Sequence, residues 1–387
     1  MRVAIIGSFP LDSNRIEGGV QSAFAYLVNG LRQIDDLEVH ILTFGGRGLK
    51  GADQLEQDGV TIHLLPPFPR FEMAKNFRTY QTVLNQKLAQ IRPSVVHAQD
   101  ATDHAYVALR SGYPTVVTVH GVRREDGKYV GSWRVRLRNY VYSLLIERSI
   151  MRKTRHLIAI SRYVTAYYTK LLRPNVQVYY VPNAIDASFF DLAKSANGSD
   201  SQTILFAGRV IPRKRVLDLV QAFAKIAQQA PGVQLRIAGE YSSEREYAEA
   251  IRNFNQTANL EDRVHLLGPL AEADVLHEFA ACDMLALPSA QETTPMVIAQ
   301  AMAAGKPVVA TPVGGVAEMV CDGETGFLVQ VGDIDGLASI LRRLLENPSL
   351  RTAVGQASYK FANENYRASA VARRTYDVYQ KIAGVGR

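Results

Sequence analysis

Short runs of β-branched and aliphatic residues alternate with longer amphipathic segments along the whole chain. The first half contains the runs "RVAIIG", "EVHILT", "VTIHLL" and "TVVTVH", and the second half contains "TILFAG", "VQLRIAG", "DMLALP" and "PVVAT". Strands that alternate with helices form parallel sheets, because each right-handed crossover returns the chain to the same end of the sheet. The pattern therefore predicts an α/β protein with a doubly wound parallel sheet in each half.

The length of the chain indicates two domains. A chain of 387 residues exceeds the size at which a single hydrophobic core keeps growing. The small and polar segment "DLAKSANGSDSQ", residues 191–202, is the expected seam. We therefore expect a first domain over residues 1–190 and a second over residues 191–365, with a final helix in residues 366–387 that crosses back to the first domain.

The composition excludes several classes of protein. The chain has 47% hydrophobic and 21% charged residues and no apolar run near the ~20 residues of a transmembrane helix, as is typical of globular proteins. The opening "MRVAIIGSFP" is typical of a first strand rather than a signal peptide, so we expect a cytoplasmic location. Cys282 and Cys321 lack metal-ligand spacing, so neither a disulfide framework nor a zinc cluster is expected.

The net charge of +7 is concentrated in residues 123–155, which hold ten Lys or Arg and three Asp or Glu. There, "WRVRLRNYVYSLLIERSIMRKTR" mixes basic residues with aromatic and aliphatic ones. This mixture is typical of a helix that rests on anionic lipid, here at the inner face of a membrane. A solvated helix with an apolar stripe toward the core explains it equally well. Nucleic acid is not an expected partner, because no nucleic-acid-binding module surrounds the segment.

In doubly wound sheets, ligands bind beyond the carboxyl ends of the strands. After the first strand, Gly18 and Gly19 precede a helix expected to begin near Val20, and paired glycines with free amides favour an anion. A glycine-rich turn without a ligand is the alternative. His120 directly follows the strand "TVVTV", where it can donate to a substrate oxygen or phosphate. His97 ends a similar strand without a glycine and is interpreted as structural.

The second half carries cations in the loop after its first strand. In "TILFAGRVIPRKRVLDL", Gly208 and Arg209 follow the strand, and Lys214 precedes a helix. Two fixed cations at such a loop suit a diphosphate, because arginine offers a planar fork and lysine a compact charge. Arg213 and Arg215 are interpreted as solvated charges that flank the helix.

Two shorter signals lie further along the second half. The strand "RVHLLG" ends in a bend at Gly268 and Leu270 whose backbone groups could receive a flat base. The segment "GDIDG" gives Asp333 and Asp335 the D-x-D spacing that can hold a metal bound to a nucleotide-sugar, but its position before a helix favours capping. We therefore expect no metal site and no cofactor.

The most informative stretch is "SAQETTPMVIAQAMAAGKPVV". A helix is expected from Thr294, as N-cap, to Gly305, with Pro295 as its first residue. The helix start can hold a phosphate. Glu292, just before the helix, can accept sugar hydroxyls, and Gln300, on its second turn, can bond further hydroxyls. The residues expected to face the ligand at the helix start are Thr294, Pro295, Met296 and Val297.

Taken in order, these motifs resemble family 4 of the retaining glycosyltransferases over nearly the whole chain. The resemblance is carried by "EGGV", "VTVHG", "AISRYV", "VPNAID", "FAGRVIPRK", "LRIAGE", "LLGPL", "E-x7-Q" and "GGVAEMV…GETGFLV". It implies the GT-B fold, in which two Rossmann-like domains face a central cleft. By this resemblance the first domain binds the acceptor and the second binds the nucleotide-sugar.

The resemblance also implies roles for single residues. Arg209 and Lys214 would neutralise the diphosphate leaving group, and Glu292 would hold the donor sugar. Gln300 would face the ribose, where the family has a second glutamate. The amide loses a charge-assisted hydrogen bond, which costs on the order of 1 kcal/mol. The residues implied to lie against the donor sugar, the acceptor or the reaction centre are His120, Gly18 and Gly19.

The expected reaction transfers a hexosyl unit to a hydroxyl of a glycan or lipid-linked acceptor, with retention of the anomeric configuration and without a metal. UDP-glucose is the first choice of donor, and polysaccharide or glycolipid biosynthesis is the expected setting. Two alternatives of the same fold are a sugar phosphorylase, which needs inorganic phosphate, and a nucleotide-sugar epimerase, which needs no acceptor. A non-catalytic nucleotide-sugar-binding subunit is a third alternative, suggested by Gln300.

Overall fold

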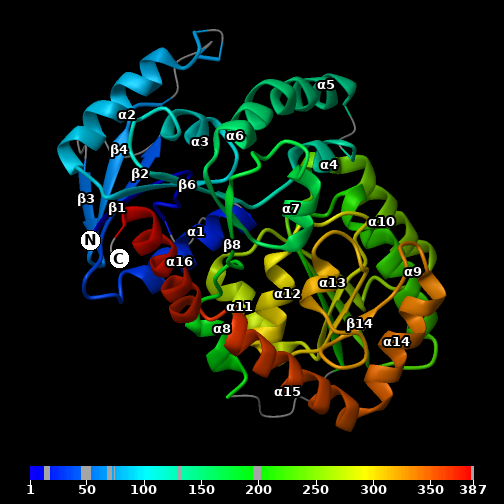
Figure 1. Cartoon of the computed structure of the whole chain (residues 1–387). Coiled ribbons are helices and arrows are strands. Elements are labelled where there is room, and N and C mark those ends of the chain that lie inside the picture. The colour runs from blue at the N-terminus through cyan, green and yellow to red at the C-terminus, as the bar shows by residue number, and fades with distance from the viewer. Residues whose placement is uncertain are drawn as a thin grey trace. The chain divides into compact units, whose positions relative to one another are not determined.

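The computed structural model describes residues 1–12, 18–44, 54–67, 72–73, 75–129, 132–194 and 202–384. The chain forms two compact units (Figure 1). Unit 1 consists mainly of Met1–Asp12, Gly19–Ala184 and the C-terminal segment from Ala368, and unit 2 mainly of Ile185–Arg367. The division after Ala184 precedes the expected seam, of which residues 195–201 lie outside the described part of the chain.

Unit 1 is built on an eight-stranded sheet with the order β3-β4-β2-β1-β5-β6-β7-β8. The pair β3 and β4 is antiparallel, and every other neighbouring pair is parallel, as the alternating sequence pattern predicts. The strands are β1 (Arg2–Ile6), β2 (Glu38–Phe44), β3 (Gln54–Gln57), β4 (Val60–Leu65), β5 (Val95–Gln99), β6 (Thr115–Val119), β7 (His156–Ala159) and β8 (Gln177–Tyr180).

The helices of unit 1 cover both faces of this sheet. They are α1 (Gly19–Leu31), α2 (Arg78–Ile91), α3 (Asp103–Ala108), α4 (Arg123–Gly127), α5 (Trp133–Tyr142), the π-helical turn η1 (Ser143–Glu147), α6 (Arg148–Lys153), α7 (Arg162–Tyr168) and α16 (Ala368–Ala383). Successive strand residues point to opposite faces. On one face, Ala98 and Val117 join a core with α2, α3 and α6. On the other, His97 and Thr118 point toward α16.

The last helix, α16, packs against α1 in unit 1 (Figure 1). The two helices approach so closely at Gly30 that a Cβ added there would lie 2.3 Å from the carbonyl oxygen of Ala368. Only glycine fits this crossing without moving the backbone. Close packing at Gly30 therefore explains why the C-terminal segment from Ala368 belongs to unit 1.

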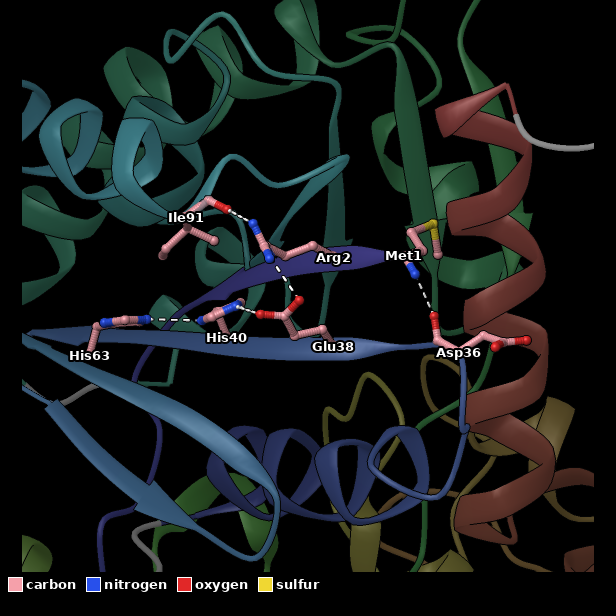
Figure 2. A network of polar contacts seen from close by, with 7 residues as sticks. All are labelled: Met1, Arg2, Asp36, Glu38, His40, His63 and Ile91. Atoms are coloured by element: carbon pink, nitrogen blue, oxygen red, sulfur yellow. Dashed lines mark hydrogen bonds and ion pairs between the residues drawn. The ribbon is translucent and has the colours of Figure 1, made fainter.

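A row of polar side chains links three strands of unit 1, as Figure 2 shows. Arg2 donates from Nε to Glu38 at 2.9 Å, Glu38 lies 2.8 Å from Nε2 of His40, and Nδ1 of His40 lies 3.1 Å from Nε2 of His63. Burial lowers the pKa of His63 to about 4, so this ring is neutral at neutral pH. Arg2 and Glu38 begin their strands, at the edge opposite the carboxyl ends where ligands bind. We interpret the row as structural.

Unit 2 is built on a six-stranded parallel sheet with the order β11-β10-β9-β12-β13-β14. Its strands are β9 (Thr203–Ala207), β10 (Gln234–Ala238), β11 (Val264–Gly268), β12 (Met284–Leu287), β13 (Val308–Ala310) and β14 (Phe327–Leu328). Strands β9 and β12 are buried throughout. The reversal of strand order at β9 leaves the loops after β9 and β12 beside each other, where a doubly wound sheet binds its ligand.

Helices connect the strands of unit 2 and flank its sheet (Figure 1). They are α8 (Ala187–Leu192), the 3-10 turn η2 (Pro212–Lys214), α9 (Val216–Ala227), the 3-10 turn η3 (Ser242–Glu244), α10 (Arg245–Thr257), α11 (Glu272–Ala281), α12 (Met296–Ala303), α13 (Val316–Met319), α14 (Ile334–Glu346) and α15 (Pro348–Asn365). Helix α14 packs on α9, and α15 packs on α12.

Candidate functional site

The loop after β9 brings a buried lysine to the carboxyl end of the sheet in unit 2. Gly208 has φ +141°, and a Cβ added to it would lie 3.7 Å from Cε of Lys214. The turn η2 ends at Lys214, whose side chain is only 11% exposed. Gly208 and Lys214 therefore lie together, as the sequence predicted for a ligand-binding loop, although the lysine is buried rather than projecting into water.

Lys214 contacts the loop after β12 through an ion pair. Its Nζ lies 2.5 Å from Oε1 of Glu292, a carboxylate that is also almost fully buried. Nη1 of Arg213 lies 3.4 Å from Oε2 of the same carboxylate and donates to the carbonyl oxygen of Gln291. Two cations thus face one carboxylate, which leaves one positive charge in excess. We call these three residues, Arg213, Lys214 and Glu292, the charged cluster.

The prediction that Arg213 is a solvated charge was wrong. Its side chain is 12% exposed and points into the charged cluster. Both Arg213 and Lys214 reach Glu292 from the short turn η2, which a sequence pattern does not reveal for so short an element. Arg215 differs from them. It is the N-cap residue before α9, with φ 52°, is about one-third exposed and pairs with Asp218 at 2.6 Å.

Burial and charge oppose each other in the charged cluster. Burial alone would raise the pKa of Glu292, but the charges of Lys214 and Arg213 outweigh it and hold the pKa below its usual value. Burial lowers the pKa of Lys214, against the opposing charge of Glu292. An ionised carboxylate between two cations is the state that satisfies all three groups, because an unpaired charge in this interior is costly.

Backbone hydrogen bonds fix the two loops that form the charged cluster. The N–H of Ala290 donates to the carbonyl oxygen of Arg213 at 2.8 Å, which joins the loop after β12 to η2. The hydroxyl of Thr311 donates to the carbonyl oxygen of Ser289 and ties the same loop to the residue after β13. The cluster is therefore assembled by the fold before any ligand arrives, as electrostatic preorganisation requires.

Helix α12 begins one residue later than expected. The N-cap is Pro295, with an extended ψ of 123°, and the first helical residue is Met296, so the prediction that Thr294 caps the helix was wrong. Pro295 has no N–H, and the amides offered at the helix start are those of Met296 and Val297. The last helical residue is Ala303. Gly305, two residues beyond it, has the left-handed φ of +68° that is common after a helix end.

Two polar side chains at this helix are buried. Gln300 is 6% exposed. The Oγ1 atom of Thr294 is buried and lacks a partner in the described part of the chain. Buried polar groups are normally satisfied. The hydroxyl of Thr294 is therefore available to a ligand or to ordered water.

Glycines bring the loops after β9, β10 and β11 together. A Cβ added to Gly239 would lie 1.8 Å from the carbonyl oxygen of Gly208, and the N–H of Gly239 donates to the carbonyl oxygen of Gly268 at 2.8 Å. Gly268 has φ +74°, so the predicted bend at the end of β11 is present, and Leu270 beyond it is half-buried. Arg209, which follows Gly208, is exposed. An exposed cation therefore lies close to the charged cluster, where its charge acts on Lys214.

His120 directly follows β6 in unit 1, as predicted from the sequence. Its Nδ1 lies 3.0 Å from Oδ1 of Asn183, and its Nε2 lies 2.7 Å from Oε1 of Gln99. Burial lowers the pKa of His120, against the raising effect of Asp100, so the ring is neutral and carries one N–H. One of the two amides must then present its NH2 group. A substrate oxygen reaches a ring nitrogen only by replacing Gln99 or Asn183.

A small cavity adjoins His120 within unit 1, with room for about one water molecule. His97 lines it as well, and its Nδ1 lies 2.6 Å from the hydroxyl of Tyr379 in α16. Burial lowers the pKa of His97 to about 3, which fits the structural role predicted for it. Sequence reasoning assigned no role to Gln99 or Asn183, although Asn183 stands within the motif "VPNAID".

The paired glycines lie at the start of α1. Gly18 has φ +91° and Gly19 is the first helical residue, one position before the expected start. Both are exposed. A side chain at Gly18 would meet no atom within 4 Å, so the backbone conformation, not crowding, requires the glycine.

The D-x-D spacing serves helix capping, as predicted. The side chain of Asp333 accepts from the N–H of Gly336 at 2.8 Å at the start of α14. Asp335 pairs with Lys225. Both carboxylates are therefore accounted for by contacts within unit 2.

The basic segment forms α4, α5, η1 and α6 in unit 1. No residue of α5 is fully buried, although Val135, Asn139 and Tyr142 are half-buried at helical spacing. The large apolar side chains that are exposed in this segment are those of Tyr129, Trp133, Leu137, Tyr140, Val141, Leu144 and Leu145. The alternative of a core-facing stripe holds for the end of this segment, where Tyr142, Ile146, Ile150 and Met151 pack in the core of unit 1. None of the helices that the structure describes is long and apolar enough to cross a membrane.

Comparison with known proteins gives matches over most of the chain. Residues 188–361 match the family model described as glycosyl transferases group 1, and residues 17–189 match the model of glycosyltransferase family 4. Glycogen synthase of Mycobacterium tuberculosis is 28% identical over 74% of this chain and 69% of its own length. Phosphatidyl-myo-inositol mannosyltransferase of Mycolicibacterium smegmatis is 26% identical over 100% of this chain and 95% of its own.

Solved structures resemble the whole chain. Sucrose-phosphate synthase from Thermosynechococcus elongatus has a TM-score of 0.80 at 22% identity and covers 100% of both chains. The Anabaena protein HepE, in complex with UDP-glucose, has a TM-score of 0.72 at 21% identity and covers 99% of this chain and 98% of its own. These likenesses, with the two parallel sheets, confirm the predicted GT-B fold class.

Proposed function

Because this chain belongs to the glycosyltransferase family described by the group 1 and family 4 models, we propose that it transfers a hexosyl unit from a nucleotide diphosphate sugar to a hydroxyl group, with retention of configuration. The observation that carries the proposal is the charged cluster, Arg213, Lys214 and Glu292, at the carboxyl end of the sheet in unit 2. It combines excess positive charge with a carboxylate, as a diphosphate joined to a sugar requires.

In this proposal the donor lies across the loops after β9 and β12. Lys214 and the exposed Arg209 bind the diphosphate together with the amides of Met296 and Val297. Glu292 accepts hydrogen bonds from the sugar hydroxyls. Gln300, a buried amide on α12, faces the ribose. The bend at Gly268 and Leu270 receives the base.

The proposed reaction forms a bond between the anomeric carbon and the acceptor oxygen on the face from which the phosphate leaves. The bond from the anomeric carbon to the phosphate oxygen breaks, and the acceptor hydroxyl proton passes to the leaving phosphate. No protein nucleophile takes part. The developing phosphate charge is stabilised by Arg209, Lys214 and the start of α12, a preorganised electrostatic role that we propose in place of a metal.

We propose that His120 lies against the donor sugar and the acceptor, in exchange for one of its two amide partners. Gly18 and Gly19 would line the same reaction centre, since both are exposed at the start of α1. UDP-glucose remains the first choice of donor, and the complex of HepE with UDP-glucose supports that choice.

A panel of nucleotide-release assays tests this function. We expect nucleotide diphosphate to be released from the donor only when a hydroxyl acceptor is added. Release that depends on inorganic phosphate would identify a phosphorylase, and conversion of the donor sugar without an acceptor would identify an epimerase. Tight nucleotide binding with no turnover on any acceptor would identify a non-catalytic binding subunit and overturn the transferase proposal.

We further propose that unit 1 contacts an anionic membrane surface through α5, at the cytoplasmic face, and that the acceptor is lipid-linked or a growing glycan there. The apolar residues Trp133 and Leu137 of α5 and Leu144 of the following turn η1 recur at helical spacing, with exposures of 67%, 52% and 40%. Arg134 and Arg138 flank this stripe. The combination matches an interfacial helix, which inserts apolar side chains and attracts anionic headgroups.

Liposome flotation tests the membrane proposal. We expect the unaltered protein to float with vesicles rich in phosphatidylglycerol but not with pure phosphatidylcholine vesicles. Replacement of Arg134, Arg136 and Arg138 by Glu should reduce recovery with the anionic vesicles at least tenfold, because each basic residue near the surface contributes about 1 kcal/mol. Equal recovery of the variant and the unaltered protein would overturn the proposal.

The substitution Gln300→Glu is expected to keep or tighten donor binding. A carboxylate accepts a ribose hydroxyl in a charge-assisted hydrogen bond, which is about twice as strong as the neutral bond of an amide. Isothermal titration calorimetry with UDP-glucose compares the two proteins directly. A large loss of affinity in Gln300→Glu, with the helical circular dichroism signal unchanged, would show that Gln300 does not face the ribose.

A further inference from the structure

Arg213 meets the carboxylate of Glu292 in a different way from Lys214. Its Nη1 lies 3.4 Å from Oε2 of Glu292 and also donates to the carbonyl oxygen of Gln291. Its own carbonyl oxygen accepts from the N–H of Ala290 at 2.8 Å. Arg213 is thus bound to the backbone of the loop that carries Glu292, whereas Nζ of Lys214 donates to the carboxylate itself.

This difference has a consequence when a diphosphate arrives. Lys214 is a flexible point charge and can turn its ammonium group toward phosphate oxygens, while a guanidinium held by a backbone carbonyl stays in place. Once Lys214 turns away, a buried Glu292 would keep no counter-charge unless a second cation remained. An unpaired buried carboxylate takes up a proton, which occupies one of its lone pairs and turns that oxygen from an acceptor of sugar hydroxyls into a donor.

We propose that Arg213 is a positioning residue for the donor sugar: it keeps Glu292 ionised and oriented while Lys214 serves the diphosphate. This inference rests on the proposed function, because it assumes that the charged cluster binds a nucleotide diphosphate sugar. It divides the two cations by task. Lys214 acts on the leaving group, and Arg213 acts on the sugar through Glu292.

The test compares a nucleotide diphosphate with its sugar conjugate, because a merely structural role would weaken both alike. Calorimetry measures the dissociation constants of UDP and UDP-glucose, and of GDP and GDP-mannose, for the unaltered protein, Arg213→Met and Arg213→Lys. For Arg213→Met we expect the dissociation constant of the conjugate, divided by that of its diphosphate, to rise roughly tenfold, which is the effect of losing one charged hydrogen bond. Arg213→Lys keeps the charge, so the rise in this ratio should be smaller.

Arg215→Met is the matched control. Arg215 stands two residues away and pairs with Asp218 rather than with Glu292, so its replacement should leave the ratio unchanged. As the pH is lowered, conjugate binding by Arg213→Met should be lost at a higher pH than binding by the unaltered protein. The reason is that loss of the adjacent cation raises the pKa of Glu292, which then takes up a proton earlier.

The outcomes separate the inference from the function on which it rests. An unchanged ratio in Arg213→Met, or equal losses for the diphosphate and its conjugate, would overturn the role of Arg213 while leaving the transferase proposal in place. If Arg213→Met does not fold, Arg213→Gln, which also removes the charge, takes its place, and an unchanged ratio in Arg213→Gln overturns the inference as well. If the unaltered protein binds neither diphosphate nor conjugate, the proposed function fails and this inference fails with it.

Discussion

Replacement of Lys214 by Ala is expected to lower turnover by about a hundredfold or more, the effect of removing one preorganised stabiliser of a developing charge. Lys214 is buried, lies 2.5 Å from Glu292 and ends the turn after β9. The substitution removes the cation assigned to the leaving phosphate. Its effect should appear in kcat for nucleotide release, at saturating donor, rather than only in KM.

The control for Lys214→Ala is Lys225→Ala, in the same unit. Lys225 is half-exposed and pairs with Asp335 on the surface, so its removal should leave kcat unchanged. Lys214→Met retains more of the buried apolar stem and should lose turnover to the same extent if the charge is what matters. Near-normal kcat in both Lys214 variants would remove Lys214 from the mechanism.

Replacement of Glu292 by Gln is expected to have opposite effects on the two parts of the donor. Transfer should fall by about a hundredfold or more, because the amide is a weaker acceptor for the sugar hydroxyls that orient the donor. Binding of free UDP should tighten, because the amide in Glu292→Gln no longer neutralises Lys214 and Arg213, and both cations can pair with the diphosphate instead. Calorimetry with UDP and a turnover assay measure the two effects separately.

The same substitution has a consequence for stability. Without the carboxylate, two buried cations repel each other, and breaking a buried ion pair in this way costs roughly 3–5 kcal/mol. The midpoint of thermal unfolding should therefore fall in Glu292→Gln, and UDP should raise it by more than in the unaltered protein. Weaker UDP binding in Glu292→Gln, or unaltered transfer, would contradict the assignment of this carboxylate to the sugar.

Much of the fold was predictable because hydrophobic periodicity is a local property. Strands such as β9 and β12 are buried on both sides and appear as short continuous apolar runs. The positions of His120 and Gly208 followed from the rule that ligands gather at strand ends. The return of α16 to unit 1 was expected, but the contact at Gly30 that permits it depends on two helices far apart in sequence.

The parts that sequence did not predict depend on side-chain direction over distances that no periodicity encodes. Arg213 lies next to Lys214 in a turn of three residues, where neither helix nor strand spacing assigns a face. The amide partners of His120 come from β5 and from the loop after β8, 84 positions apart along the chain for Gln99 and Asn183. The outward stripe of α5 has the same spacing as a core stripe, so only the structure distinguishes them.

The most direct test of the central claim, that the charged cluster of unit 2 binds a nucleotide diphosphate sugar, is a thermal-shift titration of nucleotide diphosphates and their sugar conjugates. A ligand that binds only the native state raises the unfolding midpoint by mass action. The account predicts a saturable rise for at least one conjugate with the unaltered protein and its loss in Lys214→Ala. Absence of a rise with every nucleotide, or an equal rise in Lys214→Ala, would contradict it.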